Sequence, residues 1–267
     1  MLSPLYGQLS PLRIPTKSAR IVQDTDALTY ISAVETADAQ TLEDSVKFAY
    51  EAFIVGCKSD GIWSAIKSSC ILAGARSLSG ALVPLAGSAP TNNNFVSGDY
   101  NRKTGLIGNA STKRINTNRN STADPQNSKH ISAYVTERHL VGNTFYLGGS
   151  NVSGYSMLYI VNNAGGLGLR LNSTSSSSLG GNVNNALFGV SRNNSSQIIA
   201  RSNKSSQTLS NASTAAVSQA QQVFCSGSSA LFSGGRISFY SIGEALDLAL
   251  LDTRVSNLMT ALAAAIP

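Results

Sequence analysis

Residues 104–135 read TGLIGNASTKRINTNRNSTADPQNSKHISAYV, and this stretch divides the chain into two kinds of sequence. Its last part alternates strictly: Ile131, Ala133 and Val135 fall on one face of an extended strand, and the residues between them fall on the other. A short apolar segment opens the stretch, and a polar segment rich in asparagine follows it. The pattern predicts a short strand, a polar loop and a second strand, which together form the opening hairpin region of an all-β domain.

Asparagine marks the boundary of that domain, because all but one of the 22 asparagines lie between Asn92 and Asn211. The sequence before them favours helix. We therefore expect an extended N-terminal arm at residues 1–24, a helical attachment or oligomerisation section at 25–87, and a β domain with a closing helix at 88–267. The length suits one medium domain with an appendage.

The β section contains many short alternating segments. Leu167, Leu169 and Leu171 alternate with Gly168 and Arg170, and clusters of Asn, Gly and Ser separate successive segments. Short strands at this spacing without intervening helices predict a sandwich or jelly roll.

The arm contains three prolines in its first fifteen residues, which exclude a helix. An apolar segment too short to fold alone is either disordered or laid across a partner. We favour docking, and the candidate attachment residues are Leu9, Leu12, Ile14 and Ile21.

The helical section and the closing segment carry apolar stripes. They are Leu28/Ile31/Val34, Leu42/Val46/Ala49/Phe53 and Leu251/Val255/Leu258/Leu262, and residues 58–72 read as a further helical piece. Such stripes pack either on the β domain or against other copies of the chain. Since one jelly roll offers limited surface, we expect at least one stripe to meet another subunit in a homo-oligomer.

The net charge of +6 is uneven, because residues 88–242 hold twelve basic and three acidic side chains. The basic residues are scattered singly without aromatic neighbours, so an anionic partner surface is favoured over nucleic acid. No segment has transmembrane length or a signal-peptide pattern, which predicts synthesis in the cytoplasm without membrane insertion. Three cysteines without ligand spacing are expected to be reduced.

No pattern in the β section points to catalysis, a metal or another cofactor. Its only acidic residues are Asp99, Asp124 and Glu137, and they are not neighbours in sequence, whereas glycosidases need a pair of carboxylates. His130 and His139 lie nine residues apart and lack clustered partners. We therefore expect a protein without enzymatic activity.

Several motifs resemble those of one protein family. Gly108–Lys113 leading to Asn116–Arg119, together with Arg236–Leu246 and its following helix, resembles the concanavalin-A-like (laminin-G-like) jelly roll of tailed-phage virion proteins. Gly61–Arg76 and Phe95–Gly105 are similar to the same family, especially to proteins of phages of marine cyanobacteria. The resemblance covers roughly residues 25–267.

This resemblance implies a tail-fibre, spike or other external virion component, made in the host bacterial cytoplasm and commonly threefold. Its partners would be other virion proteins, reached through the arm, and a host cell-surface polysaccharide. Two alternatives stay open, a capsid decoration protein without receptor binding and a glycan-cleaving depolymerase.

Glycan recognition would fall to loops, which vary without disturbing a sandwich. Asn, Ser and Arg supply hydrogen bonds to hydroxyls and acidic sugars. The candidate loops are 119–129 and 172–185, and the candidate residues are Arg119, Asn120, Asp124 and Asn127.

Overall fold

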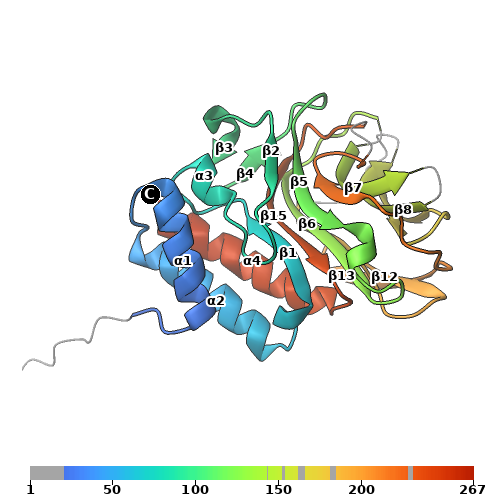
Figure 1. Cartoon of the computed structure of the whole chain (residues 1–267), viewed down its shortest axis with the longest axis horizontal. Helices are drawn as coiled ribbons and strands as arrows, with labels where there is room; N and C mark the ends of the chain where they lie inside the picture. The colour runs from blue at the N-terminus through green and yellow to red at the C-terminus, as the bar shows by residue number, and fades with distance from the viewer. Residues whose placement is uncertain (1–20, 143, 152–153, 162–165, 181–184, 228–230) are drawn as a thin grey trace, which may run out of the picture.

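The computed structural model describes residues 21–267 apart from 143, 152–153, 162–165, 181–184 and 228–230. Three of the predicted attachment residues, Leu9, Leu12 and Ile14, therefore lie outside the described residues. Figure 1 shows helices on one side of a β-sandwich. The predicted class, a mainly β jelly-roll sandwich preceded by helices and closed by a C-terminal helix, is confirmed.

Two antiparallel sheets form the sandwich. Sheet A has the order β13-β12-β11-β6-β15-β4-β3, and β1 also pairs with β15. Its strands are β1 (Ile66–Ile71), β3 (Tyr100–Asn101), β4 (Gly105–Ile107), β6 (Lys129–Glu137), β11 (Leu187–Arg192), β12 (Gln197–Ser202), β13 (Ser205–Ser210) and β15 (Arg236–Gly243).

Sheet B has the order β10-β9-β8-β7-β14-β5-β2. Its strands are β2 (Thr91–Asn93), β5 (Arg114–Asn120), β7 (Thr144–Asn151), β8 (Gly154–Val161), β9 (Gly166–Leu171), β10 (Ser177–Leu179) and β14 (Ala220–Val223).

The helices form a third layer on the outer face of sheet A. They are α1 (Thr25–Asp38), α2 (Asp44–Ser59), the short α3 (Leu78–Ala81) and α4 (Leu248–Ala265); short 3₁₀ turns are η1 (Trp63–Ala65), η2 (Ser97–Asp99) and η3 (Ser121–Ala123). Asp24 caps α1 and Asp247 caps α4 with side-chain oxygens that accept backbone N–H bonds. Among the described residues, no helix is both long and apolar enough to span a bilayer.

Two large apolar cores result from this layering, and Phe145, Met157 and Tyr159 of sheet B form a smaller third cluster among the described residues. Ile131, Ala133 and Val135 are fully buried between the sheets, as their alternation predicted. The opposite face of sheet A packs on the helices through residues such as Leu187 and Phe239. Sheet B thus covers the inner face of sheet A, and the helices cover part of its outer face.

Residues 104–135 do not form a hairpin, so that prediction is wrong. β4 belongs to sheet A, β5 to sheet B and β6 to sheet A again. The predicted polar loop contains β5, which buries Ile115 and Thr117 while exposing asparagine on its other face. The chain crosses the sandwich twice here, which joins the two sheets.

The helical prediction for residues 58–72 is also wrong over most of its length. Ile66–Ile71 forms β1, which pairs with residues 239–243 of β15. Pairing with a strand about 170 residues away in sequence outweighs the local preference for helix. The spacing of apolar residues within 58–72 carries no information about this distant partner, so the prediction failed.

The three apolar stripes are buried within one chain. Ile31 and Val34 of α1, Val46 and Phe53 of α2, and Leu251 of α4 all belong to the core between helices and sheet. The limited surface of one jelly roll therefore does not require a second subunit, because the helices also pack against one another. Leu28, with 46% of its surface exposed, lies outside this core.

Candidate functional site

Residues 119–129 and 172–176 of the two predicted glycan loops lie together at one end of the sandwich. We call this the loop end and define it by residues 119–129, 172–176, 193–196 and 211–219. The rest of the second predicted loop differs: residues 177–179 form strand β10, and residues 181–184 lie outside the described residues. Asn172 joins the two predicted loops, since its Nδ2 donates to the carbonyl of Gln126 over 2.9 Å. Its own carbonyl accepts from the N–H of Thr214 at 2.7 Å. Asn172 has a φ of +48°, a left-handed conformation that asparagine tolerates.

Arg119 and Asp124, two of the predicted glycan residues, form an ion pair with each other. Arg119 Nε donates to Asp124 Oδ2 at 3.1 Å, and a second bond makes the contact bidentate. The Asp124 side chain is only 1% exposed. Asp124 therefore anchors its loop from inside and does not face a ligand.

The other two predicted residues lie nearer the solvent. Asn120 Oδ1 accepts from the N–H of Thr122, which caps η3, and its Nδ2 donates to Ser218 Oγ at 3.3 Å. Asn127 is exposed at the tip of the loop. Of the four predicted residues, Asn127 and Asn120 are the ones placed to touch a ligand.

Lys129 is a fully buried cation beneath the same loop. Its Nζ donates to the carbonyl of Ser121 at 2.7 Å and to Ser121 Oγ at 2.6 Å, and Gln221 Nε2 donates to that Oγ at 2.9 Å. Burial lowers the pKa of Lys129 to about 8, although the nearby Asp124 carboxylate partly opposes the shift. The contact resembles a Ser–Lys catalytic pair. Both residues are fully buried, however, so their role here is to hold η3 in place.

Arg192 fastens the remaining segments of the loop end and is also fully buried. Its guanidinium donates to the carbonyls of Leu171, Asn194 and Asn211 and to Asn211 Oδ1 at 2.6–3.2 Å. Burial lowers its pKa. Sequence reasoning missed Arg192, Lys129 and Asn172, because isolated polar residues beside strands look alike whether they face inward or outward.

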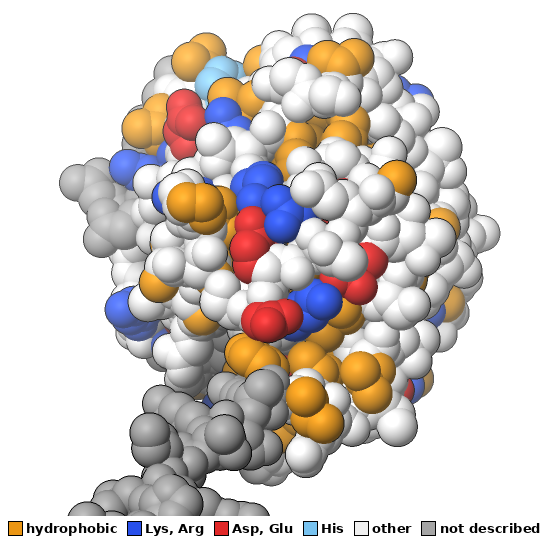
Figure 2. Space-filling model, turned by 90° about the vertical axis from the view of Figure 1, so that its left-hand side faces the viewer, with side chains coloured by type: hydrophobic (Ala, Val, Ile, Leu, Met, Phe, Trp, Pro, Cys, Tyr) orange, Lys and Arg blue, Asp and Glu red, His pale blue; other side chains and the backbone are white. Residues whose placement is uncertain are grey.

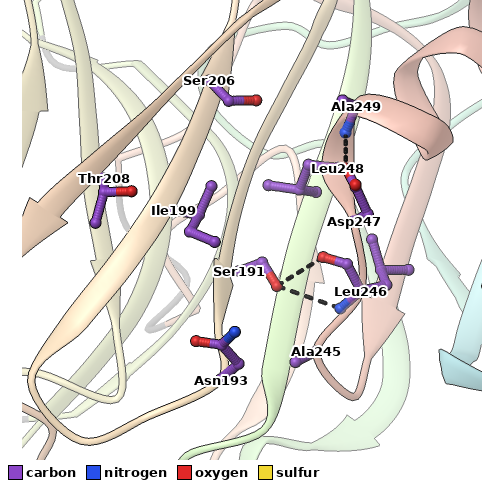
Figure 3. A pocket seen from close by; sticks show the side chains of 10 residues that line it. All are labelled: Ser191, Asn193, Ile199, Ser206, Thr208, Ala245, Leu246, Asp247, Leu248 and Ala249. Carbon is purple, nitrogen blue, oxygen red and sulfur yellow. Dashed lines mark hydrogen bonds between the residues drawn. The ribbon is translucent and has the colours of Figure 1, made fainter.

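A groove of about 590 Å³ begins at the loop end and runs between the outer face of sheet A and the start of α4. Figure 3 shows its side chains: β11–β13 and the loop after β11 form one wall, and residues 245–249 form the other. The lining residues are Ser191, Asn193, Ile199, Ser206, Thr208, Ala245, Leu246, Asp247, Leu248 and Ala249.

The groove exists because α4 covers only part of sheet A. Ser191 is fixed between the walls, since its Oγ donates to the carbonyl of Leu246 at 3.0 Å and accepts from the N–H of Leu246 at 3.3 Å. Leu248 lies against Gly189, and a Cβ added at Gly189 would come within 2.9 Å of Leu248 Cδ2. Beyond this contact, Ile199 of β12 with Ser206 and Thr208 of β13 forms the floor of the groove.

A second, apolar groove of about 410 Å³ lies between α1 and α2 beside the start of the described chain. Ile21, the one described residue of the predicted attachment set, lines it and is 67% exposed. Leu28 and Phe48 also line it, and Glu35 and Lys47 pair at 2.8 Å on its rim. Figure 2 shows hydrophobic side chains gathered on this helical face of the molecule.

Much of the predicted basic charge is neutralised within the chain. Arg102 donates to both oxygens of Glu43 at 3.1 and 2.8 Å, and this hydrogen bond lowers the pKa of Glu43 to about 2. Arg201, largely buried, pairs with Asp252 of α4 at 2.9 Å. Asp252 of α4 thus neutralises a basic residue of sheet A, and Glu43 at the start of α2 neutralises Arg102 in the turn after β3, which offsets part of the charge imbalance.

The described residues contain no group of three or more His, Cys, Asp and Glu side chains arranged to hold a metal ion. Cys57, Cys70 and Cys225 are buried thiols without disulfide bonds, as predicted.

No protein-family model matches the chain, and no curated protein matches it in sequence. Solved structures resemble parts of it. A CBM40 module of a Ruminococcus gnavus IT-sialidase bound to α2,3-sialyllactose shares 15% identity at a TM-score of 0.38, over 49% of this chain and 83% of the module. The binding domain of botulinum neurotoxin serotype G shares 12% identity at a TM-score of 0.49, over 73% and 50%.

A leech intramolecular trans-sialidase shares 14% identity at a TM-score of 0.39, and the match spans 62% of this chain but only 27% of the enzyme. The chain likewise spans only half of the toxin domain. All three are similar to this chain in part of the β-sandwich, and values this low carry no conclusion about its ligand.

Proposed function

We propose that this protein is a non-enzymatic structural component of a bacteriophage particle and that its lectin-like sandwich binds a glycan of the host surface. The observation that carries the binding role is the construction of the loop end. Three buried polar residues, Lys129, Asn172 and Arg192, fasten loops that are rich in exposed amides and hydroxyls. A surface whose loops are already ordered loses less conformational entropy on binding. Amides and hydroxyls can form hydrogen bonds with the hydroxyl groups of sugars.

The virion role rests on the resemblance to tailed-phage jelly rolls, and we place the protein in the tail fibre or another tail-associated part. Attachment would use the arm, with Ile21 and the exposed apolar groove between α1 and α2 as its described part. The homo-oligomer, proposed as a trimer, would then be held by the arm and this groove, because the helical stripes are internal.

Binding of purified full-length protein to an array of bacterial surface polysaccharides tests the glycan role. We expect retention on at least one polysaccharide without any shortening of its chains. Shortened chains would instead identify a depolymerase. Absence of binding to every polysaccharide would remove the receptor-binding role.

Labelling of phage particles with an antibody against the protein tests the virion role by electron microscopy. We expect label on the tail. Label on the head would identify a decoration protein, and particles without label would contradict the structural role altogether.

A further inference from the structure

Of the ten residues that line the groove between sheet A and α4, five are polar and five are aliphatic. The polar ones are Ser191, Asn193, Ser206, Thr208 and Asp247, and no aromatic residue is among the described lining residues. Sites for drug-like or lipid ligands are predominantly apolar or aromatic. A sugar ring offers hydroxyl groups on its edge and C–H groups on its faces, which suits this mixed lining.

Pairing of the strands places the aliphatic Ile199 between two hydroxyl side chains. Thr208 lies opposite Ile199 on the neighbouring strand, and Ile199 lies opposite Ser191 on the next. These three side chains therefore share the outer face of sheet A. Among the described residues, Thr208 Oγ1 has no hydrogen-bond partner and is exposed, so it can donate to a ligand and accept from it.

The charge in the groove is acidic. Asp247 is exposed and uses Oδ1 to accept from the N–H of Ala249 at 2.7 Å. Among the described residues, no Lys or Arg lines the groove. Arg201, which donates to Oγ of the lining residue Ser206 at 3.1 Å, is bound to Asp252. A carboxylate on a ligand would meet Asp247 without a cation to offset it.

A separate hollow of about 170 Å³ lies further along α4, and its lining shares no residue with that of the groove. Arg201 and Lys204 line this hollow on the sheet side, and Asp252, Thr253, Ser256 and Asn257 line it on the helix side. Its cationic side chains are therefore not among the residues that line the groove beside Asp247.

We infer that the groove between β11–β13 and the first turns of α4 binds a segment of a neutral polysaccharide. Thr208 and Asn193 bond the sugar hydroxyls, Ile199 and Leu248 contact the sugar C–H faces, and Asp247 excludes acidic sugars. This inference rests on the proposed glycan-binding function and names the site and the ligand class within it.

The test uses the full chain on an array of neutral and uronic-acid-containing oligosaccharides of bacterial surface polysaccharides. Ala249→Trp fills the groove, and Leu250→Trp places the same bulk on the next residue of α4, which does not line it. Thr208→Val removes one hydroxyl inside the groove, and Ser210→Ala removes one outside it.

We expect the wild-type protein to bind neutral oligosaccharides most tightly. Ala249→Trp should weaken binding at least tenfold and Thr208→Val by about fivefold, while the two controls change it less than twofold. Asp247→Asn preserves a good helix cap and should raise the affinity for uronic-acid oligosaccharides while leaving neutral binding in place.

The outcomes separate the two claims. If the wild-type protein binds glycans and Ala249→Trp binds them equally well, the groove is not the site, although the glycan-binding function stands. Exclusive binding of acidic oligosaccharides would overturn the ligand class. If the wild-type protein binds no oligosaccharide, the proposed function itself is wrong.

Discussion

At the scale of single residues, His130 shows how the fold constrains a side chain at the loop end. Its ring is fully buried; Nδ1 lies 2.6 Å from the carbonyl of Glu244, and Nε2 lies 2.8 Å from Ser241 Oγ. Because a carbonyl only accepts, Nδ1 carries the proton and Nε2 accepts from the hydroxyl. Burial lowers the pKa of His130 to about 4, with Asp124, Arg119 and Lys129 as the nearby charges.

This shift predicts an acid-dependent loss of stability. The unfolded chain binds the proton below about pH 6.5 and the folded chain only below about pH 4, so the free energy of unfolding falls as pH drops through that window. The loss is roughly 3 kcal/mol. Urea unfolding between pH 7 and 4 should show this extra loss in the wild-type protein and not in His130→Gln. Equal losses in the two proteins would show that His130 does not titrate in this window.

Gly189 provides a second test at this scale. A Cβ there would meet Leu248 Cδ2 at 2.9 Å and Ser132 Cβ at 3.1 Å, whereas nothing lies within 4 Å of a Cβ at Gly98. Gly189→Ala should therefore cost about 1–3 kcal/mol of stability, and Gly98→Ala should leave stability nearly unchanged. Thermal unfolding of both variants measures the difference. An unchanged stability of Gly189→Ala would show that Leu248 of α4 does not pack closely against Gly189 of sheet A.

At the scale of elements, sequence patterns predicted the strands and helices that bury one face, because such burial spaces apolar residues regularly along the chain. β6 and β9 alternate, and α4 carries a full apolar stripe after its capping Asp247. β5 was missed because its outward residues are Arg and Asn, which resemble a loop. β1 was missed because it pairs with β15, which is distant in sequence, and this pairing produces no recognisable spacing of residues within β1 itself. The buried anchors of the loop end were missed for the same reason, since Arg192 reaches Asn211 across 19 residues.

The cap of α4 gives a prediction for this element. Asp247 accepts from the N–H groups of Ala249 and Leu250. Asp247→Ala should destabilise the protein by about 1 kcal/mol, and Asp247→Asn by a few tenths at most, since Asn also caps well. Chemical unfolding of the two variants checks this, and equal destabilisation by both would assign the effect to charge instead of capping.

At the scale of the whole molecule, the structure assigns different tasks to its layers. The helices cover part of sheet A, and Asp252 of α4 neutralises Arg201 of β12. We propose that the exposed apolar surface near Ile21 and Leu28 serves attachment. Removal of residues 1–22 should preserve the fold but abolish both oligomer formation and incorporation into particles.

Sedimentation velocity and particle reconstitution measure these two losses. We expect a trimer for the full chain and a monomer for the shortened one, with unchanged circular dichroism. Particles that incorporate the shortened chain normally would contradict the role of the arm, and a full chain that stays monomeric at micromolar concentration would contradict the oligomer.

The central claim is that the sandwich binds a glycan between sheet A and α4 at the loop end. Hydrogen exchange of the full chain, with and without the best-binding oligosaccharide, tests it most directly because backbone protection locates the contact. The account predicts slower exchange in residues 191–196, 205–210 and 245–253 and unchanged exchange in α1 and α2. Protection confined to sheet B or to the helical face, or no protection at saturating oligosaccharide, would contradict it.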